Sequence, residues 1–110
     1  MTKNNIKSYA EKEMKRMSTI MKGLKIISKS KLALHFSDVR NSKISEQPKS
    51  LAKDFSDFAS NYFNDGLYFF KKKMFIESFE AFIISWSYID CGLKLKFFAV
   101  PKEQKEWFTT

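Results

Sequence analysis

The stretch that decides the fold runs from Ser60 to Leu95 and reads SNYFNDGLYFFKKKMFIESFEAFIISWSYIDCGLKL. Apolar residues recur in it at steps of three and four, which is the spacing of one face of an α-helix. The clearest interruption is the run of three lysines before Met74, and clustered lysines suit the partial negative charge of a helix C-terminus. The stretch therefore predicts two helices that meet at a turn around Lys73 and Met74.

The two helices extend beyond this stretch on both sides. The earlier one is expected over about residues 46–72, because Ser45 can cap its free amides and Pro48 fits its first turn. The later one is expected over about residues 75–98, because Pro101 disfavours helix in the residue before it. Its main apolar stripe comprises Phe75, Phe79, Phe82, Ile83, Trp86, Leu93 and Phe97.

A third amphipathic segment lies upstream and predicts a first helix over about residues 3–28. Its stripe comprises Ile6, Ala10, Met14, Met17, Met21 and Leu24. Residues 29–45 show no such period and are expected to form a long connector. Residues 99–110 are expected to form a tail in which Trp107 and Phe108 dock on the bundle. The sequence thus predicts a single all-α domain over residues 1–110, an up-and-down three-helix bundle without a sheet, whose third helix is the most deeply buried.

The composition limits the classes of protein to consider. The chain has 110 residues, enough for one core, and 44% of them are hydrophobic, which is typical of a folded domain. The single cysteine cannot form an internal disulfide and suits a reducing cytoplasm, so we expect a cytoplasmic protein. No apolar run is long enough to span a membrane, and the first residues lack the apolar core of a signal peptide.

The positive charge is confined to one half of the chain. Residues 1–49 hold 12 Lys or Arg and 4 Asp or Glu, so the whole formal net charge of +8 lies there. The lysines expected along one side of the first helix are Lys3, Lys7, Lys15, Lys22, Lys25 and Lys29. Such a ridge can bind an acidic protein or follow a phosphate backbone without reading its sequence, or it can simply be a solvated surface.

Two carboxylates are candidates for chemistry. Asp90 falls on the main apolar stripe of the third helix, where an unpaired charge would be costly, and Asp65 falls at the edge of the stripe of the second. They can be buried structural groups bonded to a tyrosine or a lysine, or the acid and base of a small helical hydrolase or nuclease. We expect the structural role, no metal site and no cofactor, because two ligands are too few for a metal.

Three further residues are weaker candidates for catalysis. His35 and Arg40 lie in the connector in an order that differs from that of helical ribonucleases, so we interpret them as solvated residues. Cys91 lacks an evident base and is interpreted as a small hydrophobe. The sequence therefore predicts a protein without enzymatic activity.

The third helix carries a second apolar stripe, nearly opposite the first. It consists of Ile84, Tyr88, Cys91 and Leu95. A helix of a small bundle seldom buries two sides within one chain, so we expect a homodimer to cover this stripe, with Ala81 and Gly92 allowing close approach. The alternative is cover within the chain, either by Leu32, Leu34 and Phe36 of the connector or by the tail.

The segment from Ser60 to Leu95 resembles the archaeal family known as domain of unknown function 357. Family features map to Tyr62, to Asp65 with Gly66, to Phe69, to the turn at Lys73–Met74 and to the run Ile89-Asp90-Cys91-Gly92. The sequence departs from the family at the turn, where Lys-Met replaces Gly-Asp, and at Gly66, Ile89 and Cys91. The resemblance implies an all-helical three-helix bundle with no assigned activity.

Overall fold

The computed structural model describes residues 3–27 and 47–109. In chain order its elements are α1 (Lys3–Gly23), β1 (Lys25–Ile26), α3 (Gln47–Lys71), α4 (Phe75–Lys94), β2 (Phe98–Ala99) and the 3-10 helix η2 (Lys102–Trp107). The three α-helices confirm the predicted all-α fold. No helix within the described residues is both long and apolar enough to cross a membrane.

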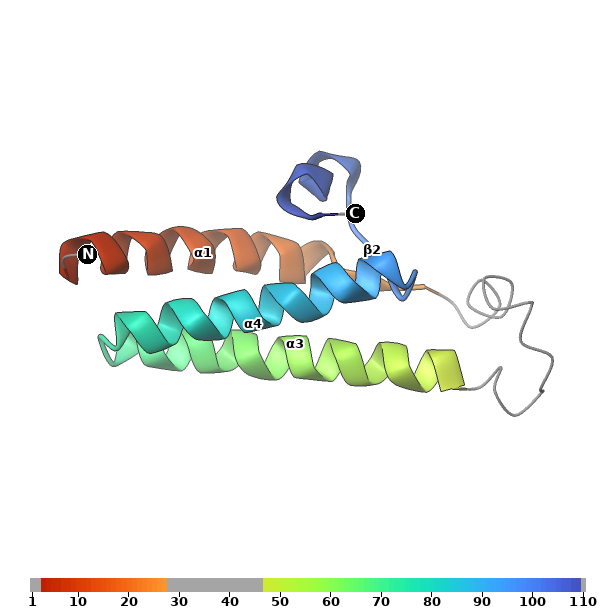
Figure 1. Cartoon of the computed structure of the whole chain (residues 1–110), viewed down its shortest axis with the longest axis horizontal. Coiled ribbons are helices and arrows are strands. Elements are labelled where there is room, and N and C mark those ends of the chain that lie inside the picture. The colour runs from red at the N-terminus through yellow and green to blue at the C-terminus, as the bar shows by residue number, and fades with distance from the viewer. Residues whose placement is uncertain (1–2, 28–46, 110) are drawn as a thin grey trace.

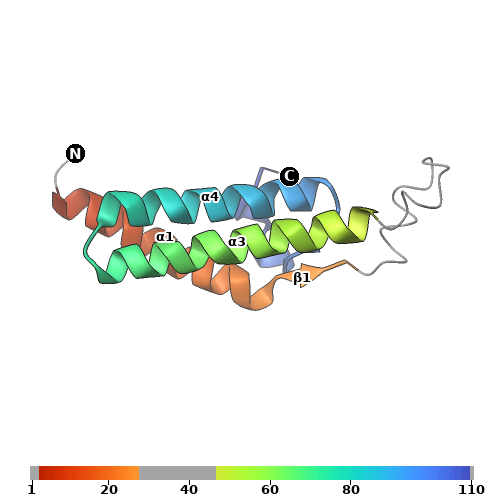
Figure 2. The same cartoon turned by 90° about the horizontal axis from the view of Figure 1, so that it is seen from below.

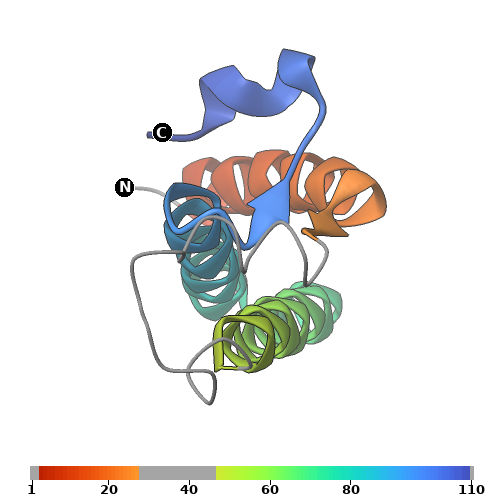
Figure 3. The ribbon, with the colours of Figure 1, turned by 90° about the vertical axis from the view of Figure 1, so that its right-hand side faces the viewer.

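The α-helices pack as an up-and-down bundle in which α4 contacts both of the others (Figure 1). α3 and α4 form an antiparallel hairpin, and α1 runs in the same direction as α4 (Figure 2). Seen along the bundle, η2 lies beyond α1 on the side away from α3 (Figure 3). α4 is therefore the helix that organises the bundle, as its apolar composition predicts.

The prediction of no sheet is wrong in one detail. β1 and β2 pair antiparallel, with Lys25 opposite Ala99 and Ile26 opposite Phe98. α1 ends at Gly23 and α4 at Lys94, both earlier than predicted, so short extended segments emerge at the same end of the bundle. Gly23 weakens the end of α1, and the β-branched side chain of Ile26 favours the extended backbone of β1.

The hairpin turn between α3 and α4 is a Schellman motif. The Met74 amide donates to the Phe69 carbonyl at 2.9 Å, and the Lys73 amide donates to the Phe70 carbonyl at 3.0 Å. Lys73 has φ of 62°, a left-handed conformation that usually falls to glycine. The turn thus lies where the sequence predicts it, and Lys73 takes the left-handed position that closes it.

The C-terminus of α4 repeats this arrangement. The Phe97 amide donates to the Gly92 carbonyl at 2.8 Å, and the Lys96 amide donates to the Leu93 carbonyl at 3.1 Å. Lys96 has φ of 66°. This second motif reverses the chain and directs Phe98 back over α4, which sets up the pairing with β1.

Replacing either left-handed lysine by glycine should stabilise the protein. The left-handed conformation destabilises the folded state by about 1–2 kcal/mol when the residue is not glycine. Replacement by glycine removes this cost, but glycine loses more conformational entropy on folding, so the net gain is smaller. We expect Lys73→Gly and Lys96→Gly each to raise the free energy of unfolding by about 0.5–1 kcal/mol in guanidinium denaturation. Lys72→Gly, one residue before the left-handed position, should not stabilise, and equal gains at Lys72 and Lys73 would contradict the explanation.

The side of α4 that faces the core is rotated from the predicted stripe. Its buried residues are Ser78, Ala81, Phe82, Ser85, Ile89 and Gly92. Ser78 and Ser85 donate across the hairpin to the carbonyls of Gly66 and Ala59, at 2.8 Å and 2.6 Å. Small, hydrogen-bonded side chains let α3 approach α4 closely, and the larger predicted residues such as Phe79, Ile83 and Trp86 are displaced to half-buried positions.

Candidate functional site

An apolar patch lies on the surface of the α3–α4 hairpin. We define it as Ile84, Tyr88 and Cys91 of α4, Leu95 directly after the end of α4, and Phe58 of α3. Ile84, Leu95 and Phe58 are 40%, 41% and 45% exposed, and Cys91 is exposed as well. The four predicted residues of α4 therefore share one surface, and Phe58 joins it from the neighbouring helix.

Tyr88 anchors this apolar patch on α3. Its ring lies 5.7 Å from that of Phe55, 5.2 Å from that of Phe58 and 6.0 Å from that of Tyr62. Beside Tyr88 is a hollow of about 210 Å³, lined by Phe55, Ile84, Ser87, Tyr88 and Cys91. The second stripe is thus partly covered by α3, an arrangement that the spacing along one helix does not predict, and Ile84 and Cys91 stay open to solvent.

The tail docks on another side of α4. The Trp86 indole N–H donates to the Trp107 carbonyl at 2.9 Å, and the rings of Trp86 and Phe108 stack at 6.1 Å. Trp107 also lies under the guanidinium of Arg16, 5.8 Å from its ring centroid. The predicted docking of Trp107 and Phe108 therefore occurs, and it does not cover the apolar patch. Leu32, Leu34 and Phe36 of the connector lie outside the described residues.

Ala81 and Gly92 do not contribute to a second interface. Both are buried inside the chain, and a Cβ atom at Gly92 would overlap the ring of Phe98. The expectation that they allow approach of another copy is wrong, because β2 folds back over Gly92. Ser87, exposed between Ile84 and Cys91, is a small residue at the edge of the apolar patch.

Asp90 holds the tail. It is half-buried, and its two carboxylate oxygens accept hydrogen bonds from the Thr109 amide at 2.9 Å and the Thr109 hydroxyl at 2.6 Å. The predicted pairing is present, although the partner is a threonine of the tail rather than a tyrosine or a lysine. The two hydrogen bonds of Asp90 therefore attach the tail to α4.

Asp65 is exposed on α3, so the expectation of a buried group is wrong. It lines a hollow of about 250 Å³ together with Glu77 and Glu80 of α4. Asp90 lies ten residues beyond Glu80, about 15 Å along the helix. The two aspartates therefore do not meet as an acid–base pair. Among the described residues, no three His, Cys, Asp or Glu side chains converge as a metal site requires.

The other catalytic candidates gain no partner in the described part of the chain. His35 and Arg40 lie outside it. Cys91 is exposed, and the residues that line its hollow include no His, Asp or Glu that could act as its base. The geometry at Cys91 fits an apolar surface residue.

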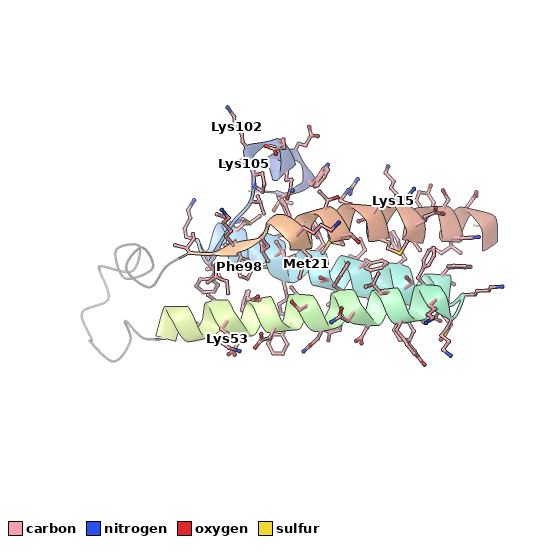
Figure 4. All side chains as sticks on the ribbon, turned by 180° about the vertical axis from the view of Figure 1, so that it is seen from behind. Lys15, Met21, Lys53, Phe98, Lys102 and Lys105 are labelled. Atoms are coloured by element: carbon pink, nitrogen blue, oxygen red, sulfur yellow. The ribbon has the colours of Figure 1, made fainter. Side chains whose placement is uncertain are left out.

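The outward side of α1 forms a basic face, which we define as Lys12, Lys15 and Lys22. All three are exposed, and within the described residues Lys15 forms an ion pair with Glu11 at 3.7 Å. Lys15 points away from the bundle, on the side where Lys102 projects from η2 (Figure 4). Lys12 was missed from the sequence, although its place three residues before Lys15 puts it on the same helical arc.

The remaining predicted lysines are arranged differently. Lys7 is exposed and its Nζ lies 5.8 Å from the ring centroid of Phe75, while Lys25 is exposed in β1. The side chain of Lys3 and the whole of Lys29 lie outside what the structure describes. Lys25 therefore lies beyond the end of α1, and the ammonium group of Lys7 lies beside Phe75 of α4.

The outer side of α3 contrasts with the basic face of α1. Its Lys53 is paired with Asp57 at 2.8 Å, and this hydrogen bond and the charge of Asp57 raise the pKa of Lys53. Glu13 of α1, in turn, is buried and accepts from Arg16 at 3.1 Å, away from the outward lysines. The carboxylates of Asp57 and Glu13 thus pair with Lys53 and Arg16 and not with the outward lysines of α1.

Comparison with known proteins identifies the family. A family model described as Protein of unknown function (DUF357) matches residues 27–98, which contain α3 and α4. The basic face of α1 and the tail lie outside the matched range. Neither the curated proteins nor the solved structures contain a significant match. Because the match covers more than half of its length, the chain belongs to the DUF357 family of proteins of unknown function.

Proposed function

We propose that this protein is a non-catalytic interaction module that pairs with a second copy of itself and presents the basic face of α1 to an acidic partner. The observation that carries the proposal is the apolar patch, whose aliphatic and aromatic side chains remain exposed after the chain has folded. The separation of Asp65 from Asp90 supports this proposal over a hydrolase or a nuclease.

The apolar patch is better explained by a partner than by chance exposure. Single exposed apolar residues are common, whereas neighbouring ones that form a continuous surface mark interaction sites. Ile84, Cys91 and Leu95 follow one another along α4, and Phe58 adds an aromatic ring beside Tyr88. Covering such an area removes apolar surface from water at about 25 cal/mol per Å².

Self-association is tested with Ile84→Glu. A charge in the middle of the apolar patch should convert the dimer that we expect at micromolar concentration into a monomer, measured by multi-angle light scattering. Ile84 is a better probe than Tyr88, because Tyr88 also packs on three aromatic rings of α3.

Leu67→Glu is the matched control for this experiment. Leu67 is 37% exposed, close to the value for Ile84, and lies about 180° around α3 from Phe58. The Leu67 variant should remain a dimer. A wild-type protein that stays monomeric at these concentrations would overturn the proposed self-association.

The basic face supports the second half of the proposal. Lys12, Lys15 and Lys22 are exposed along α1, and their ammonium groups favour carboxylate or phosphate partners through long-range attraction. Tyr9 is the only aromatic residue of α1 and packs edge-on against Phe79 at 6.4 Å. A single aromatic ring cannot stack successive bases, so the surface is better suited to an acidic protein than to single-stranded nucleic acid.

Binding is tested by fluorescence anisotropy with a labelled poly-glutamate peptide and, as the alternative, a labelled DNA duplex. We expect the combined Lys12→Ala, Lys15→Ala and Lys22→Ala variant to weaken binding at low salt at least tenfold. The matched control carries Lys71→Ala, Lys72→Ala and Lys73→Gly, which removes three lysines at the hairpin turn.

The two probes separate the possible partners. Duplex binding whose log–log salt slope is about −0.9 per phosphate contact would assign the basic face to nucleic acid. Absence of binding to both probes would overturn the proposal that the basic face binds an acidic partner.

A further inference from the structure

The exposed side of α4 has charges of opposite sign at its two ends. We define this α4 outer face as Glu80, Ile84, Ser87, Cys91 and Lys94, all of which are exposed. Their steps of four, three, four and three place them along one line of the helix surface. The α4 outer face therefore begins with an acidic residue, continues through small and apolar residues and ends with a basic one.

Ser87 is the centre of this arrangement. Glu80 and Lys94 are each seven residues from it, which is about 10.5 Å along the helix. In a two-fold contact, whatever residue i touches in the second copy must touch residue i in return. If two α4 helices cross antiparallel at Ser87, each Glu80 faces the other copy's Lys94, and this pairing occurs twice. A parallel crossing would place Glu80 against Glu80 and Lys94 against Lys94.

We propose that two copies of this chain pair through their α4 outer faces, antiparallel and centred on Ser87, with Glu80 of each copy against Lys94 of the other. The inference rests on the proposed self-association and adds its direction and register. A two-fold axis normal to the two helices keeps the same flank of each α4 on the same side. Over seven residues the helix surface drifts by about 20°, so Glu80 and Lys94 lie slightly to opposite flanks of Ser87, and a shallow left-handed crossing of about 20° brings the two charges together.

The centre of the contact is suited to close approach. The Ser87 hydroxyl already donates to the Ile83 carbonyl at 2.9 Å, so the interface leaves it satisfied. The hollow between Ile84, Ser87 and Cys91, about 210 Å³ in volume, can receive the Ile84 side chain of the second copy. By symmetry, each copy places its Ile84 in the hollow of the other. A pair of Glu80 and Lys94 then flanks the apolar contact at each end.

A charge exchange tests the direction. Glu80→Lys alone, or Lys94→Glu alone, places like charges opposite each other at both ends of the antiparallel pair. We expect each variant to raise the dimer dissociation constant at least tenfold in analytical ultracentrifugation. An equimolar mixture of the two variants should restore wild-type affinity, because both ends of the mixed dimer are attractive. Circular dichroism confirms that each variant is folded.

A disulfide experiment tests the register. In a Cys91→Ala background, Ser87→Cys should cross-link two copies under mild oxidation, because helices that cross closely bring their facing Cα atoms within disulfide range. Glu80→Cys in the same background is the control, because the two introduced thiols lie about 21 Å apart along the helices. It should not cross-link.

The outcomes separate the inference from the proposal beneath it. A wild-type monomer overturns both. A wild-type dimer whose affinity is unchanged by Glu80→Lys and Lys94→Glu overturns the antiparallel pairing and leaves self-association standing. A dimer that cross-links through Glu80→Cys and not through Ser87→Cys likewise overturns the register. Weakening by each variant, rescue in the mixture and cross-linking at Ser87 together establish it.

Discussion

Replacing Phe82 with alanine should lower the free energy of unfolding by about 3–5 kcal/mol. The side chain is fully buried at the centre of the α3–α4 hairpin, and its ring lies 5.9 Å from that of Phe63. Alanine would leave a cavity that the two helices cannot close, because Ser78 and Ser85 fix their spacing through hydrogen bonds to α3. Guanidinium denaturation followed by circular dichroism measures the loss.

The reciprocal change at Gly66 tests the same contact from the other helix. A Cβ atom there would overlap the Phe82 ring, so Gly66→Ala should cost about 1–3 kcal/mol despite the better helix propensity of alanine. Gly23→Ala is the control, because its Cβ would meet Pro101 at an ordinary 3.4 Å. Adding Phe82→Leu to Gly66→Ala should cost less than the sum of the single changes. Strict additivity would contradict a direct steric contact.

Replacing Phe108 with alanine should lower the free energy of unfolding by about 3 kcal/mol. Phe108 is 9% exposed and lies parallel to Trp86, with an interplanar angle of 1°. Its neighbour Thr109 is fixed by Asp90 through two hydrogen bonds, so the aromatic ring cannot easily move to fill the gap. Tyr68→Ala, at a residue 56% exposed, should cost less than about 1 kcal/mol. A loss at Phe108 no larger than the small loss expected at Tyr68 would show that the tail does not stabilise the bundle.

Hydrophobic periodicity predicted what is local in this fold. The helical hairpin, its turn at Lys73 and the amphipathic first helix all follow from side chains a few residues apart. The buried side of α4 was misplaced because Ser78, Ser85 and Gly92 carry no apolar signal of their own. They are buried because α3 and β2 approach closely there, and that approach depends on Gly66 of α3 and on Phe98, both of which lie outside α4.

The sequence predicted the parts of the candidate surfaces that lie on one helix better than the parts that depend on contacts between elements. Ile84, Cys91 and Leu95 share one side of a single helix, so spacing alone places them together. The contribution of Phe58 and the covering of Tyr88 by α3 depend on how two helices pack, and spacing within one helix does not reveal it. Asp90 was recognised as a residue that needs a partner. That partner is Thr109, 19 positions away in the tail, and no periodic pattern connects the two.

The docking of the tail has a spectroscopic consequence. The sequence contains two tryptophans, Trp86 and Trp107, and both lie where the tail meets α4. Intrinsic fluorescence therefore reports the environment of this junction, whereas far-ultraviolet circular dichroism reports the three helices. The two signals will trace the same unfolding transition only if the tail and the bundle unfold as one cooperative unit. A fluorescence change that precedes the loss of helix would reveal a state in which the tail has detached from an intact bundle.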